Sequence, residues 1–343
     1  MTTNKKNHSI KKIIKSQTCM DCILTLIVFI LMIIIITNPQ KYTSGTIRGL
    51  KLFFNSVLPG LFPFMFLTKL LTEIGFVFNI SKNFNKLSLK VFNTPGISLY
   101  AFIMSILSGY PIGSKIIADL YLKGQISELD AKRMSVFCTT SGPIFIIGAV
   151  GASMFNDINI GIIIYLSHIF SSILLGIIYG KLTKKKNNAI TSEKFPNAIS
   201  LQKKSNLISE CLSQTINSLF IVAAYITIFY LLSDILDSFK IFDTLANGLS
   251  PFFKNIGINS DSTKGLFYGL IEVTRGCKTL SITKSTSSII LATGILSFSG
   301  LSIIMQSMAF LKIAKIKTHF FILTKSVHFT LSMIICYLLL III

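Results

Sequence analysis

Residues 108–115, SGYPIGSK, interrupt an apolar stretch that would otherwise predict one membrane-spanning helix. The segment ISLYAFIMSIL (97–107) precedes them and IIADLYL (116–122) follows them. Glycine and proline break a helix and free backbone N–H and C=O groups, which are costly in lipid unless protein or trapped water satisfies them. We therefore expect the break, formed by Gly109, Pro111 and Gly113, to face a polar cavity rather than to be a tolerated kink.

The composition of the whole chain is that of a polytopic membrane protein. Of the 343 residues, 51% are hydrophobic and only 13% are charged, about half the ~25% of a typical soluble protein. The apolar runs 22–40 and 329–343 each approach the roughly 20 residues that span a bilayer. The formal net charge is +20, and because lysines flank the apolar segments, we assign this charge to membrane topology and exclude nucleic acid as a partner.

Lysine-rich connections divide the chain into four parts. The loop 181–206 carries seven lysines and one acidic residue, which is typical of a cytoplasmic loop. The predicted parts are a cytoplasmic N-terminus with a first transmembrane helix (1–45), a first repeat (46–180), the basic loop (181–206) and a second repeat (207–343).

Basic loops also predict an order of crossings. With the N-terminus inside, 22–37, 52–78, 97–122 and 159–180 cross in turn, so 134–155 must enter and return on the outer side. The same logic makes 265–282 cross and 288–311 return, and places the C-terminus outside.

A cysteine introduced at the C-terminus should then react with a membrane-impermeant reagent in intact cells. Labelling only after the membrane is opened would contradict this order.

Three matches in the same order indicate that the two halves are copies. They are LFPF (61–64) with LFIV (219–222), SILSGYPIGSK (105–115) with YGLIEVTRGCK (268–278), and SGPIFII (141–147) with SGLSIIM (299–305). Since the two copies would face opposite ways, the predicted fold class is an all-α polytopic membrane protein with an inverted structural repeat and broken or re-entrant helices, a signature of secondary transporters. The second copy has EVTRG in place of GYPIG and lacks the proline.

Two small polar segments are candidates for the ends of half-helices. Ser141, Gly142 and Pro143 fit a helix start, with the serine as N-cap and the proline where a missing N–H costs nothing. Ser299 and Gly300 would do likewise in the second half, with Gln306 further along the same helix. Free N–H groups and the positive end of the helix dipole would suit an anion, whereas the alternative is close helix packing by small residues.

Four charges inside or beside apolar segments are candidate binding residues: Lys115, Glu272, Arg275 and Lys278. Glu272 and Arg275 are spaced for an ion pair on one helix face. The equivalent lysines Lys115 and Lys278 would then be surplus positive charge near a pseudo-twofold axis and could hold a dianion between them; the alternative is snorkelling to the membrane surface.

Other chemistries lack a sequence signal. No Walker A, HExxH, GxSxG or EF-hand pattern is present, so we expect neither an enzyme nor an ATP-driven pump, and neither a cofactor nor a metal site. His168, in the middle of IYLSHIFSS, is interpreted as a hydrogen-bonded packing residue rather than a proton relay.

The motifs LFPF (61–64), LSGYPIGSKIIADLYLKGQIS (107–127) and CTTSGPIFIIGAVG (138–151) resemble the YlbJ family of sporulation integral membrane proteins. The resemblance covers about residues 50–340 and includes the nucleoside-recognition Gate domain, shared with concentrative nucleoside transporters. It implies a multi-pass protein of the cell membrane or of the outer forespore membrane, on the mother-cell side.

The resemblance also implies a function late in sporulation, the movement of dipicolinate, a small planar dicarboxylate, by alternating access. The expected partners are the lipid bilayer and this small anionic substrate. A nucleoside or other small-metabolite carrier and a non-transporting scaffold are the alternatives. The coupling ion, H⁺ or Na⁺, and formation of a homo-oligomer are left open.

Overall fold

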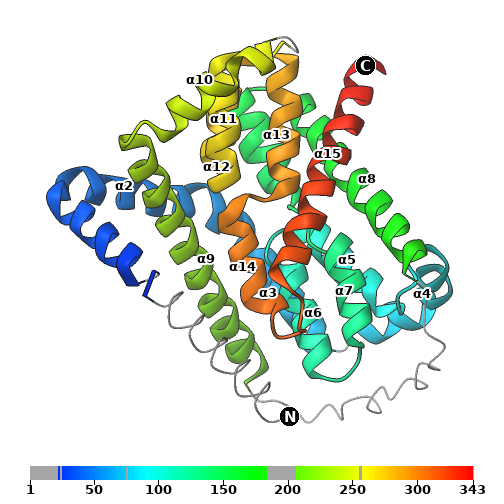
Figure 1. Cartoon of the computed structure of the whole chain (residues 1–343). Coiled ribbons are helices and arrows are strands. Elements are labelled where there is room, and N and C mark those ends of the chain that lie inside the picture. Colours follow the sequence, from blue (N-terminus) through cyan, green and yellow to red (C-terminus); the bar gives the residue numbers. More distant parts are fainter. Residues whose placement is uncertain (1–21, 24, 75, 184–205, 255–256, 343) are drawn as a thin grey trace, which may run out of the picture.

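The computed structural model describes residues 22–23, 25–74, 76–183, 206–254 and 257–342. These residues form helices and connections without any β-strand, which confirms the all-α class (Figure 1). Among them, four helical segments are long and apolar enough to span a membrane, and two bent helix pairs would raise the number to six. The predicted segment 1–21 and most of the basic loop, 184–205, lie outside the described residues.

The two halves have the same order of helices. The helix Thr25–Thr37 bends by 107° into α2 (Pro39–Leu52), which continues into η1 (Phe53–Val57) and α3 (Leu58–Ile74). The first half continues with α4 (Phe76–Phe92), α5 (Ile97–Ser108), α6 (Ile112–Leu122), α7 (Glu128–Phe137), η2 (Ile144–Phe155) and α8 (Ile158–Leu182). After α9 (Leu207–Ser238), the second half has α10 (Ile241–Lys254), α11 (Ser260–Ile271), α12 (Val273–Thr283), α13 (Thr286–Phe298), α14 (Gly300–Leu311) and α15 (Thr318–Ile342).

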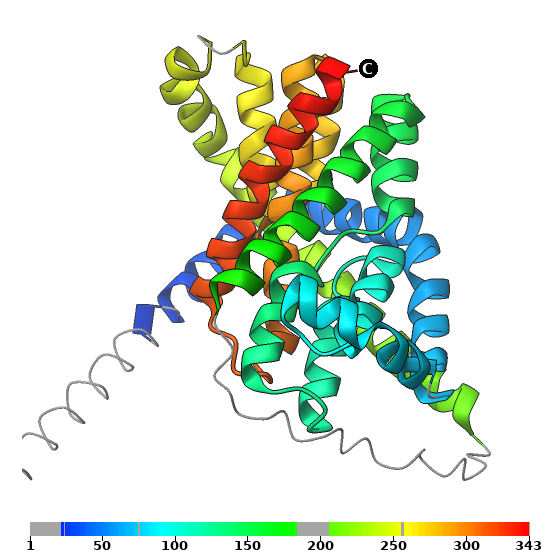
Figure 2. The ribbon, with the colours of Figure 1, turned by 90° about the vertical axis from the view of Figure 1, so that its right-hand side faces the viewer.

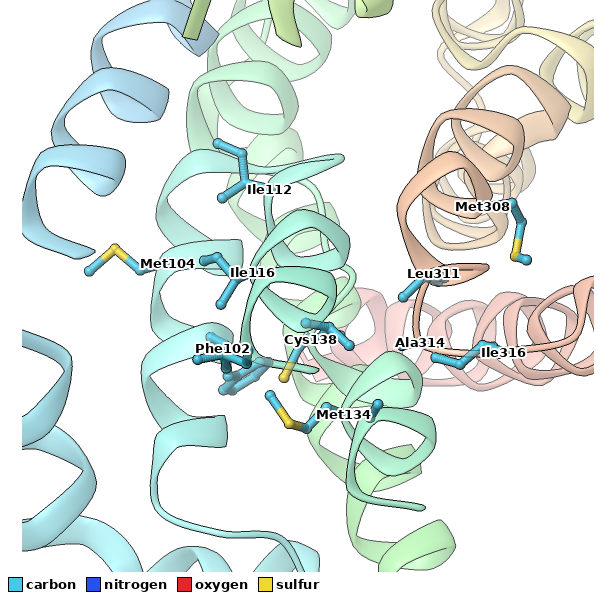
Figure 3. Close-up of a cluster of buried hydrophobic side chains, with 14 of the residues drawn as sticks. Phe102, Met104, Ile112, Ile116, Met134, Cys138, Met308, Leu311, Ala314 and Ile316 are labelled. Atoms are coloured by element: carbon cyan, nitrogen blue, oxygen red, sulfur yellow. The ribbon is translucent and has the colours of Figure 1, made fainter. Parts of the chain in front are cut away.

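The segments 97–122 and 265–282 are re-entrant hairpins, so the prediction that each crosses the membrane is wrong. In the first, α6 turns back along α5, and Figure 3 shows Ile116 of α6 next to Met104 of α5. In the second, α12 turns back along α11 so closely that a Cβ on Gly276 would lie 2.3 Å from the Cα of Gly269. Both hairpins turn where a non-helical residue ends the first arm, Gly109 with φ 78° or Glu272 with an extended backbone.

The segments 134–155 and 288–311 are broken spans, so their predicted return is also wrong. On α8, Gly161 faces Gly151 of η2, and Gly176 faces Phe137 of α7. Gly161 and Gly176 are about 22 Å apart along α8 at 1.5 Å per residue, so α7 and η2 lie end to end along this helix. Thr286–Leu311 likewise forms one apolar segment of 26 residues that breaks at Ser299. Each half therefore still has the same number of crossings. The basic loop 181–206 and the C-terminus stay on the sides of the membrane predicted for them.

The last helix of each half shows the inversion. Both α8 and α15 have 25 residues, and they pack side by side (Figure 2). In Figure 1, α8 runs downward and α15 runs upward to the C-terminus. The hydrophobic core consists of two clusters, and each contains residues of both halves. The helix breaks carry buried polar side chains, among them Ser108, Ser141 and Ser299.

Candidate substrate site at the helix breaks

A cavity of about 80 Å³ lies where the breaks of both halves meet. The hairpin tips contribute Ser108, Gly109 and Tyr110 on one side and Glu272 and Thr274 on the other, while Ser141, Gly142 and Gln306 come from the broken spans. Its remaining walls are apolar and include Val222 and Ile226 of α9. The predicted residues Gly109, Ser141, Gly142, Glu272 and Gln306 are therefore brought together.

Close backbone contacts build the first-half side of this cavity. A Cβ on Gly109 would lie only 2.7 Å from the nitrogen of Gly142, so the tip of the α5–α6 hairpin packs directly on the break before η2. Pro143, rather than Ser141, occupies the N-cap position of η2, and no side chain caps it. The prediction that Ser141 caps this helix is therefore wrong. The Ser141 backbone N–H donates instead to His168. Pro111 is the N-cap residue of α6.

Glu272 organises the second-half side. It is 2% exposed and is the N-cap of α12, where its carboxylate accepts hydrogen bonds from the Arg275 backbone N–H (2.8 Å) and the Thr274 hydroxyl (3.1 Å). The break at Ser299 and Gly300 is buried and packs on the α11–α12 hairpin. The amide nitrogen of Gln306 lies 3.3 Å from the Ser302 hydroxyl. The α11–α12 hairpin therefore turns without a proline, because the Glu272 carboxylate caps the start of α12.

The two matched lysines do not meet. Lys115 is half-buried, and its ammonium donates to the hydroxyl of Ser218 on α9 at 2.6 Å. Lys278 is exposed, and neither lysine lines the cavity. The prediction of a dianion held between them is not supported, because each hairpin turns back and carries its lysine away from the tip. Gly113 instead marks a close contact, since a Cβ there would lie 1.6 Å from the Cys138 carbonyl oxygen.

Arg275 belongs to an ionic cluster rather than to the cavity. Its guanidinium contacts Asp234 at 2.6 Å and Asp237 at 3.2 Å, both on α9, and Asp234 also binds Arg48 of α2 at 2.6 Å. The predicted Glu272–Arg275 ion pair is therefore wrong, because only the Arg275 backbone N–H contacts that carboxylate. The cluster lines a separate open cavity of about 540 Å³ and holds the α11–α12 hairpin to α9.

Sequence reasoning missed Lys325, a buried lysine on α15. It is 1% exposed, and its ammonium donates to the Thr139 carbonyl oxygen at 2.5 Å and the Tyr110 hydroxyl at 3.1 Å. The ammonium also lies 4.9 Å from the centre of the Tyr110 ring. In the described residues no carboxylate lies within ion-pair distance of it. The available signal was a lysine inside the apolar segment 319–343.

Comparison with known proteins identifies a relative over most of the chain. The sequence is 25% identical over 286 residues to the sporulation integral membrane protein YlbJ of Bacillus subtilis (strain 168). The matched region covers 78% of this chain and 70% of YlbJ. The chain is therefore similar to YlbJ over most of its length. No protein-family model and no solved structure matches it. The similarity to YlbJ and the apolar spans make the protein a multi-pass integral membrane protein, whereas the Gate domain stays a prediction.

The chain also buries a histidine pair behind the cavity. His168 accepts a hydrogen bond from the Ser141 N–H at 2.9 Å, and its other ring nitrogen lies 2.9 Å from the Ser297 hydroxyl. His328 contacts the carbonyl oxygen of His168 at 3.0 Å. Tyr110, Lys325 and the two histidines therefore form a continuous polar layer next to the wall of the cavity.

Proposed function

We propose that the protein is a secondary transporter of a small organic anion, and that it acts during sporulation by alternating access. The observation that carries the proposal is Lys325, a buried ammonium without a carboxylate partner among the described residues, joined to the cavity through Tyr110. An isolated buried charge is costly, and in membrane proteins such residues mark substrate or ion pathways. An anion in the cavity would compensate this charge.

The inverted hairpins suggest how the site would open. A cavity of about 80 Å³ holds a few water molecules, so an organic solute needs the surrounding elements to separate. The tips of α5–α6 and α11–α12 enter from opposite ends of the molecule and both line this cavity. Withdrawing one tip at a time would expose the cavity to one side of the membrane and then to the other, which is the motion that inverted repeats support.

The resemblance noted from the sequence suggests dipicolinate as the anion and the outer forespore membrane as the location. One carboxylate would interact with Tyr110 and Lys325. The other would lie near the start of η2, where Ile144 and Phe145 line the cavity and the helix dipole has its positive end. The apolar walls would contact the flat ring.

A nucleoside is the second candidate, favoured by a separate observation. Glu272 and Gln306 both line the cavity, and a carboxylate and an amide are suited to hydrogen bonds with a neutral sugar and base. The carboxylate of Glu272 would repel a dianion, although its contacts at the start of α12 offset part of its charge.

Uptake into proteoliposomes tests the two candidates. Purified protein is reconstituted, and uptake of labelled dipicolinate and labelled uridine is measured against protein-free vesicles. We expect saturable dipicolinate uptake that unlabelled dipicolinate inhibits and uridine does not. Uptake of uridine alone would assign the cavity to nucleosides. Uptake of neither solute by protein that is folded, as judged by circular dichroism, would favour a non-transporting scaffold.

A further inference from the structure

Two histidines occupy equivalent positions in the two halves. His168 and His328 each lie ten residues after the first residue of a 25-residue helix, α8 or α15. Their rings are 4.9 Å apart at an angle of 33°, and the side chains are 0% and 1% exposed. Because α8 and α15 pack together and run in opposite directions, the pair lies where the two halves meet.

Hydrogen bonds define the protonation of both rings. Nε2 of His168 accepts the Ser141 N–H, so this ring carries its proton on Nδ1 and donates it to Ser297. Nε2 of His328 faces the carbonyl oxygen of His168 and must therefore donate to it. Nδ1 of His328 is then left with a lone pair, and it has no hydrogen-bond partner among the described residues. A buried basic nitrogen without a donor is an available site for a proton.

The charges around His328 decide when it can bind that proton. Lys325 lies three residues before His328 on α15, and its ammonium contacts Tyr110. His168 faces His328 from α8. Helices α13 and α14 contain no ionisable side chain, and the charged residues of α7 lie at 128–133, remote from its broken end. A second positive charge beside Lys325 is unfavourable in a site of low dielectric constant. An anion in the cavity would remove this penalty.

We propose that Nδ1 of His328 binds a proton that is transported together with the anion. The inference rests on the proposed function and adds the coupling ion to it. The proton enters from the side to which the cavity is open, forms one N–H bond at Nδ1, and leaves to water on the other side with the anion. Lys325 and protonated His328 together balance a dicarboxylate. Since linkage is reciprocal, anion binding favours protonation, and protonation strengthens anion binding.

A simultaneous measurement of both fluxes tests this coupling. Proteoliposomes contain a pH-sensitive dye, the membrane potential is clamped with potassium and valinomycin, and labelled dipicolinate is added outside. We expect the lumen to acidify as the anion enters. Each pH unit of inward proton gradient should increase accumulation about tenfold for each coupled proton. In His328→Gln, an amide nitrogen can keep the bond to the His168 carbonyl but cannot bind the proton, so the ratio of protons to anions should fall to background.

His319→Gln is the matched control, because His319 lies on the same helix but is exposed. It should keep the wild-type ratio. Anion uptake by the wild type without any proton flux would overturn the inference while leaving the proposed function intact, as would an unchanged ratio in folded His328→Gln. If that variant does not fold, the wild-type ratio alone decides. Absence of anion uptake by folded wild type would instead reject the proposed function.

Discussion

Replacing Lys325 with methionine is expected to reduce dipicolinate uptake by at least about thirtyfold. Truncating one partner of a buried charge pair costs about 2–5 kcal/mol, and each 1.4 kcal/mol is tenfold in affinity. Methionine keeps most of the volume of the lysine but removes the ammonium that joins Tyr110 to Thr139. The measurement is the initial rate of uptake over a range of anion concentrations, with folding checked by circular dichroism.

The controls use the lysines that the sequence singled out. Lys278→Ala removes an exposed lysine and should leave uptake within about twofold of the wild type. Lys115→Ala removes a half-buried lysine whose ammonium donates to Ser218 of α9, and it should have a smaller effect than Lys325→Met. Wild-type uptake by Lys325→Met, together with loss of uptake in the other two variants, would restore the paired-lysine site and reject the one described here.

Replacing Gly113 with alanine is expected to destabilise the protein by about 3 kcal/mol or more. The added Cβ would lie 1.6 Å from the Cys138 carbonyl oxygen and 2.8 Å from the hydroxyl of Ser105. Backbone cannot move away as a flexible side chain can, so α6 must shift from the end of α7, and overpacking of this kind costs about 1–3 kcal/mol or more. Loss of helical circular dichroism on heating in detergent measures the change.

Gly248→Ala is the control for this substitution. Gly248 is an exposed glycine inside α10, and nothing lies within 4 Å of an added Cβ. Alanine is a better helix former than glycine by about 1 kcal/mol, so this variant should be as stable as the wild type or slightly more stable. Equal unfolding temperatures for Gly113→Ala and Gly248→Ala would show that α6 does not pack against α7 as described.

The positions of the helix breaks could be predicted because they depend on local chemistry. Gly109 and Pro111 together weaken a helix locally, and Ser299 with Gly300 mark the second break in a similar way. Which breaks reverse the chain could not be predicted, since exchanging the hairpin and the broken span within one half leaves the two ends of that half on the same sides of the membrane. The choice depends on contacts such as Gly276 with Gly269, which exist only after the helices have packed.

The polar residues that line the cavity could be predicted from the sequence, but the buried charge of Lys325 could not. Glu272 and Gln306 stand out as polar groups in apolar segments, and the structure places both at the cavity. Lys325 is six residues into an apolar run, where a lysine normally extends to the membrane surface. Its partner Tyr110 is 215 residues away in sequence, so only the fold brings the two together.

The length of α9 ties the protein to the bilayer around it. Its 32 residues extend about 48 Å, whereas the hydrocarbon core is about 30 Å thick. Ser218 holds Lys115 of the first hairpin, and Asp234 holds Arg275 of the second, so one helix is fastened to both hairpins. A change in lipid thickness alters the tilt of such a helix. Hydrophobic mismatch is therefore transmitted along α9 to both hairpins at once, which makes lipid chain length a determinant of how readily they move.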